Sequence, residues 1–168
     1  MPLHKSEVEI GAEFAIDELL YRRVSDAELT NGELDPSRLN SISFSKDIDG
    51  APSFLRSKFS VPHDAIHCDC SGGMDRSDWL VYYLQVGDIP GPLRSGDNRL
   101  FRFPPVHRPL PLCGAHSVLG CCEVGDTSNK YVKPSRPVRN DLRAKLATKL
   151  QPITQIFDIA TKSPLKNT

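Results

Sequence analysis

The chain has 168 residues, no net formal charge, 39% hydrophobic and 25% charged side chains, which is the composition of one globular domain. No apolar run reaches transmembrane length, and the first residues are too acidic for a secretory signal and lack its apolar core. These features argue against a membrane-spanning chain and favour a cytoplasmic protein. The five cysteines are then expected to be reduced thiols, and their odd number argues against a closed disulfide framework.

The zero net charge hides an asymmetry along the chain. Residues 1–60 hold 7 basic and 11 acidic side chains, residues 61–128 hold 5 and 8, and residues 129–168 hold 9 and 2. The three balances are therefore −4, −3 and +7. The basic C-terminal quarter indicates which partners the protein can attract, and it does not indicate the fold.

The first half of the chain contains signals for short elements. Residues 6–18 are expected to form a helix, because a serine and a glutamate at its start have capping-box spacing. Residues 19–24 either continue that helix or form a strand. Residues 41–45 alternate serine with branched or aromatic residues, as a half-buried strand does. Residues 53–58, which follow a proline, are expected to form a helical turn.

The second half predicts strands and then a helix. Residues 79–86, 100–103 and 117–124 are rich in branched and aromatic residues and end at turn residues. Four prolines make residues 104–111 an extended loop or an edge. Residues 138–150 predict an amphipathic helix. Its apolar side recurs at four-residue steps: Val138, Leu142, Leu146 and Leu150.

These elements together predict an α+β fold, with a small, mainly antiparallel sheet flanked by N-terminal and C-terminal helices. One domain is expected over residues 1–150. Residues 151–168 are expected to be a frayed basic tail, because chain ends that nothing holds in place are poorly ordered.

Reactive side chains gather in the middle of the chain. Cys113 and His116 are separated by two residues, a spacing that lets both reach one ion, and His67 with Cys68 or Cys70 can complete a tetrahedral zinc set. Cys113 beside a histidine is also a candidate nucleophile. The competing interpretation is a set of buried thiols, which behave as small hydrophobic residues, with histidines in loops.

Two histidines flank the proline-rich segment. Since the eight residues between them can fold back between two strands, we expect His107 and His116 to face the same region. A shared polar pocket is the functional interpretation, and two separate loop histidines are the alternative.

A third candidate site joins Arg22 or Arg23, Ser43 and Glu123. This order resembles ADP-ribosyltransferases of the arginine–serine–glutamate type. The resemblance implies an arginine on the phosphates of NAD, a serine that braces the site and a glutamate that stabilises the cationic ribose. The chain departs from that family where Cys121 replaces the usual acidic residue or glutamine. A surface arginine pair beside a half-exposed strand is the alternative.

A broader pattern covers two thirds of the chain. It comprises Leu-Tyr-Arg-Arg at 20–23, Ser-Phe-Ser at 43–45, Pro-Ser-Phe-Leu-Arg-Ser-Lys at 52–58, His-x-Pro at 107–109 and Ala-His at 115–116. This order resembles short, uncharacterised bacterial proteins. It implies a bacterial cytosolic protein and no particular mechanism.

Basic side chains of the predicted C-terminal helix oppose its leucine stripe. They are Arg139, Arg143, Lys145 and Lys149, with Lys130, Lys133 and Arg136 ahead of them. Such a helix can contact nucleic-acid phosphates or an acidic protein, or its charges can simply face solvent. Two function classes therefore stay open, a non-catalytic accessory protein that binds a partner through this helix and a small enzyme.

Overall fold

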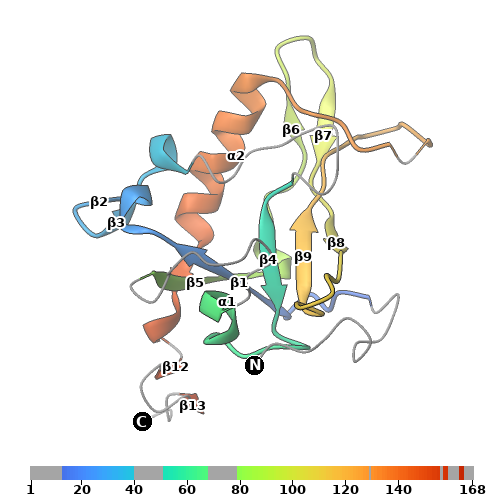
Figure 1. Cartoon of the computed structure of the whole chain (residues 1–168). Helices are drawn as coiled ribbons and strands as arrows, with labels where there is room; N and C mark the ends of the chain where they lie inside the picture. Colours follow the sequence, from blue (N-terminus) through green and yellow to red (C-terminus); the bar gives the residue numbers. More distant parts are fainter. Residues whose placement is uncertain are drawn as a thin grey trace.

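A six-stranded antiparallel sheet forms the centre of the molecule (Figure 1). The computed structural model describes residues 13–39, 51–67, 79–128, 130–155, 157–158 and 163–164. Along the sheet the strands follow the order β11 (Gln151–Pro152), β5 (Leu80–Gln85), β1 (Leu19–Val24), β4 (Ser53–Arg56), β9 (His116–Leu119) and β8 (Pro105–His107). Neighbouring strands are all antiparallel.

Smaller sheets and short helices surround this sheet. A three-stranded sheet contains β10 (Cys122–Glu123), β7 (Leu100–Arg102) and β6 (Leu93–Arg94), while β2 (Leu29–Thr30) pairs with β3 (Glu33–Leu34) and β12 (Phe157–Asp158) with β13 (Ser163–Pro164). Among the described residues, the α-helices are α1 (Asp64–His67) and α2 (Arg136–Lys149). The same part of the chain contains the 3-10 helices η2 (Asp26–Glu28), η3 (Pro36–Arg38), η5 (Val86–Asp88) and η6 (Ile153–Gln155).

The two faces of the large sheet carry different cores, because side chains of a strand alternate between faces. On the α2 face, Leu20, Phe54 and Leu119 pack with the buried side of α2. On the opposite face, which we call the α1 face, Tyr21 and Leu55 pack with residues of α1 and of the turn after β8. The antiparallel sheet and the C-terminal helix predicted from the sequence are thereby confirmed.

The predicted N-terminal helix is wrong over the residues that the structure describes, and residues 6–12 lie outside them. Residues 13–18 contain only a turn at Ile16 and Asp17. The backbone oxygens of Ile16 and Glu18 accept hydrogen bonds from Gly87 and Val86. These bonds hold the segment extended along the end of β5, so tertiary pairing outweighs the local helix signal.

Two other local predictions also need correction. Residues 53–56 form strand β4 instead of a helical turn, because they pair with both β1 and β9. The strand expected over 117–124 is interrupted at residues 120–121, where Gly120 donates to Pro104 and Cys121 accepts from Val132. Its two parts therefore belong to different sheets. Residues 41–45 lie outside the described residues.

Ordered structure continues past α2. Gln151 and Pro152 pair with β5, and the side chain of Ile153 is buried on the α1 face. The proline-rich segment contributes β8, which is the edge strand of the large sheet, a position that tolerates prolines because no neighbour needs their missing N–H.

Candidate functional site

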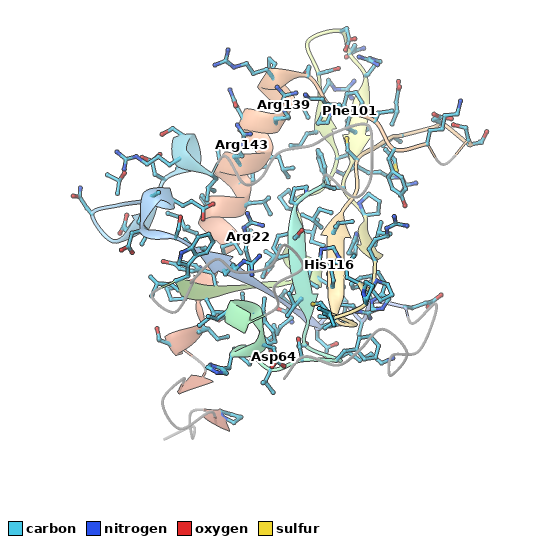
Figure 2. The ribbon with its side chains drawn as sticks, in the orientation of Figure 1. Arg22, Asp64, Phe101, His116, Arg139 and Arg143 are labelled. Carbon is cyan, nitrogen blue, oxygen red and sulfur yellow. The ribbon has the colours of Figure 1, made fainter. Side chains whose placement is uncertain are left out.

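Helix α2 carries the strongest candidate surface. Its apolar stripe is buried as predicted, with Val138, Leu142 and Leu146 in the core. Arg139 and Arg143 are partly buried, whereas Lys145 and Lys149 are exposed. Figure 2 shows Arg139 near the start of the helix and Arg143 further along it.

Three arginines share one flank of α2. Arg136, Arg139 and Arg143 are spaced by three and four residues, so their side chains lie on the same side of the helix, which we call the arginine flank. Burial lowers the pKa of Arg143, and the positive charges of Arg139 and Arg136 lower it further. The charges of Arg136 and Arg139 thus act on Arg143 across a short stretch of surface.

The two lysines lie elsewhere on the helix. At about 100° per residue, Lys145 and Lys149 project from the flank opposite the arginines. Lys145 lies 3.7 Å from Asp141, and Lys149 lies 3.9 Å from Asp88. The basic ridge expected from the sequence is therefore divided into an arginine flank and a pair of lysines that have acidic partners.

The start of α2 adds to the positive potential. A helix N-terminus carries partial positive charge, which normally attracts acidic side chains, but the first turn of α2 has none. It holds Arg136 and Arg139 instead, and Nη1 of Arg139 donates to the backbone oxygen of Pro134 at 2.8 Å. This bond fixes Arg139 over the helix start, where its charge is least favourable for helix stability.

Arg22, a candidate catalytic residue, lies buried on the α2 face, with 6% of its surface exposed. Its Nη1 donates to the backbone oxygen of Ser53 at 2.9 Å, and its Nη2 lies 4.0 Å from Glu28. The guanidinium also lies 5.5 Å from the centre of the Phe54 ring. Burial lowers the pKa of Arg22, which the charge of Glu28 opposes. Arg22 thus has structural contacts within the core of the α2 face.

The other members of that candidate site are spread over the fold. Arg23 points to the α1 face, 5.9 Å from the Trp79 ring. Glu123 belongs to the three-stranded sheet and lies 3.7 Å from Arg99. Ser43 lies outside the described residues. The structure does not bring Arg22 and Glu123 into one sheet, and the transferase interpretation with NAD stays a prediction.

His107 and His116 lie on adjacent strands but engage different partners. His107 is on the α2 face, where Nδ1 lies 3.3 Å from Nη1 of Arg56. His116 is on the α1 face, where Nε2 lies 3.1 Å from Oγ of Ser53 and Nδ1 lies 2.7 Å from the backbone oxygen of Arg108. They are close enough for the charge of His116 to lower the pKa of His107. A pocket shared by both side chains stays a prediction.

Sequence reasoning missed the most buried polar group of the described chain. Arg56 is fully buried, and its guanidinium donates two 2.7 Å hydrogen bonds to the carboxylate of Glu18. It also donates to the backbone oxygen of Glu13 and stacks 3.8 Å from the centre of the Phe14 ring. A clue existed in Phe-Leu-Arg at 54–56, because the alternation of a strand puts Arg56 on the same face as a core phenylalanine.

The predicted metal site is only partly covered by the structure. Cys113 is disulfide-bonded, which corrects the expectation of five reduced thiols, and a sulfur in a disulfide has no thiolate to offer zinc. Cys70 and the side chain of His67 lie outside the description. Among the described residues, no three histidine, cysteine or acidic side chains are grouped to hold a metal ion. Zinc stays a prediction.

Searches against family models, curated proteins and solved structures give no match to this chain. In the part of the chain that the structure describes, no helix is both long and apolar enough to cross a membrane.

Proposed function

We propose that this protein binds an acidic surface of a protein partner through the arginine flank of α2. The observation that carries the proposal is the placement of Arg136, Arg139 and Arg143 along one flank of a helix whose first turn has no acidic residue. Such an arrangement costs stability in the free protein and is relieved by an anionic partner.

The type of side chain supports a protein–protein contact. Arginine is enriched at protein interfaces, where its planar guanidinium binds carboxylates through two parallel hydrogen bonds. Arg139 and Arg143 are partly buried in the free protein. The aliphatic parts of their side chains therefore lose little conformational entropy on binding.

The charge distribution favours a local acidic patch over a long polyanion. Residues 1–128 hold 12 basic and 19 acidic side chains, a balance of −7, and would repel the extended backbone of a nucleic acid. The arginine flank spans only about 10 Å along the helix, at 1.5 Å per residue. A cluster of carboxylates on a protein surface fits that length.

Fluorescence anisotropy with two labelled probes, a short polyglutamate peptide and a short DNA duplex, tests the proposal. We expect the native protein to bind the peptide, and Arg139→Ala/Arg143→Ala to weaken binding about tenfold or more, since each lost interface arginine costs about 1–2 kcal/mol. The matched control is Lys145→Ala/Lys149→Ala, which removes the same charge from the opposite flank and should change affinity less than about twofold.

The other outcomes each overturn part of the proposal. Tighter binding of the duplex, with a steep loss of affinity in added salt, would identify nucleic acid as the partner class. Equal losses in the two double variants would show that only net charge matters. Binding of neither probe at low salt would leave the arginine flank a solvated surface.

A further inference from the structure

Ser53 and His116 form a hydrogen-bonded pair on the α1 face of the sheet, where Figure 2 marks His116. The backbone oxygen of Arg108 can only accept, so Nδ1 of a neutral His116 must carry the ring proton and donate to it. Nε2 is then the acceptor, and the hydroxyl of Ser53 donates to it at 3.1 Å. The serine hydroxyl thus donates to Nε2 of His116, and the hydrogen bond from Nδ1 to Arg108 fixes the orientation of the imidazole ring.

Regular backbone holds both side chains in place. Ser53 begins β4 and His116 begins β9, and the register puts His116 directly opposite Leu55. Since Leu55 is two residues from Ser53, the serine and the histidine share a face. The backbone oxygen of Ser53 is fixed in turn by the buried guanidinium of Arg22. The serine side chain itself is exposed, so a small substrate can reach it.

The same face also offers a positive charge. Tyr21 pairs with Leu55 across β1 and β4, and Arg23 lies two residues further along β1, toward Ser53. The side chain of Arg23 therefore projects from the α1 face on the strand beside the serine. A cation on this face favours the negative charge that develops on a carbonyl oxygen under attack.

We propose that Ser53 is a catalytic nucleophile and His116 its general base, in a site that hydrolyses small carboxylic esters. Oγ of Ser53 attacks the carbonyl carbon and forms the Oγ–C bond, while Nε2 of His116 takes the hydroxyl proton. The bond to the alcohol then breaks, and the alcohol leaves with that proton. Water attacks the acyl-serine, His116 takes a proton from it, and the departing Oγ recovers that proton as the acid is released.

Covalent labelling distinguishes this activity from an ordinary surface hydrogen bond. The full chain is incubated with a fluorophosphonate probe, which loses fluoride when an activated serine forms the Oγ–P bond, and the labelled peptide is identified by mass spectrometry. We expect labelling at Ser53. The matched control is Ser37, an exposed serine whose hydroxyl donates to Asp35 rather than to an imidazole, and it should stay unlabelled.

Two variants complete the experiment, with hydrolysis of a 4-nitrophenyl ester as the second readout. Ser53→Ala and His116→Gln should each lower the rate at least about 100-fold, because glutamine can accept a hydrogen bond but cannot take a proton. Ser37→Ala should leave the rate unchanged. Labelling that is no faster at Ser53 than at Ser37, or equal rates in native protein and His116→Gln with unchanged thermal unfolding, would overturn the proposal.

Discussion

The carboxylate of Glu18 and the guanidinium of Arg56 form a buried two-bond ion pair that ties the segment before β1 to strand β4. Both hydrogen bonds are 2.7 Å long, and Arg56 is fully buried. The rings of Phe14 and Phe59 lie against the guanidinium. This ion pair anchors residues 13–18 in the extended course that replaces the expected helix.

Removing one partner of this pair should destabilise the protein strongly. Arg56→Met leaves the carboxylate of Glu18 buried and uncompensated, and should lower the free energy of unfolding by about 3–5 kcal/mol. The double variant Arg56→Met/Glu18→Leu should recover a large part of that loss, because it removes both charges. Urea unfolding measures both values, and a loss below about 1 kcal/mol in the single variant would refute a structural role for the pair.

Stability should depend on the protonation of His107. Burial lowers the pKa of His107 below its ordinary value of 6.5, Arg56, His116 and Lys58 lower it further, and Glu18 opposes them. Geometry agrees, since arginine only donates hydrogen bonds and Nδ1 of His107 must accept from Arg56. The neutral ring is therefore favoured in the fold. The contribution of His107 to the free energy of unfolding is fully present above the pKa of the unfolded state. This contribution is lost as the pH falls from 6.5 through the lower pKa of the folded state.

The test compares thermal unfolding of the native chain and His107→Gln between about pH 7.5 and 5. The native midpoint should fall more steeply with acidification, because glutamine keeps an acceptor for Arg56 and has no proton to gain. Parallel curves for the two proteins would exclude His107 as the titrating group.

Cys121 and Cys122, which are free thiols in the described part of the chain, should be unreactive in the native state. Burial raises the pKa of Cys121 to about 12, with the neighbouring Cys122 adding to the effect, and both side chains are buried. Because the thiolate is the reactive species, iodoacetamide at neutral pH should modify neither residue until denaturant is added. Rapid modification of either cysteine in the folded protein, mapped by mass spectrometry, would show that this part of the core opens.

The sequence predicted the elements whose pattern is local. The leucine stripe of α2 needs only a period of about 3.6 residues, and β5 only a run of branched and aromatic side chains. Residues 53–56 were misassigned because a preceding proline is compatible with several structures, and their strand is decided by pairing with β1 and β9. The break after β9 likewise depends on bonds from residues 120–121 to distant segments.

The candidate sites show the same limit. The charge distribution along the sequence predicted the basic helix but not its division into two flanks. That division depends in part on Asp88, which lies far from the helix in sequence and 3.9 Å from Lys149. Adjacent arginines predicted one phosphate-binding site, yet alternation along β1 sends Arg22 into the core and Arg23 to the other face. Nothing near Ser53 in the sequence indicated that His116 lies beside it.

Charge reversal at Arg136 tests the proposed function most directly. Arg136→Glu places a carboxylate in the first turn of α2, which should stabilise the protein by about 0.3–1 kcal/mol through the helix dipole. If the arginine flank binds an acidic partner, the same change should weaken binding of the polyglutamate peptide about tenfold or more. The control Lys149→Glu makes the same change of charge on the opposite flank, in the last turn, and should lower stability while leaving affinity nearly unchanged. Unaltered affinity in the more stable Arg136→Glu protein would contradict the proposed function.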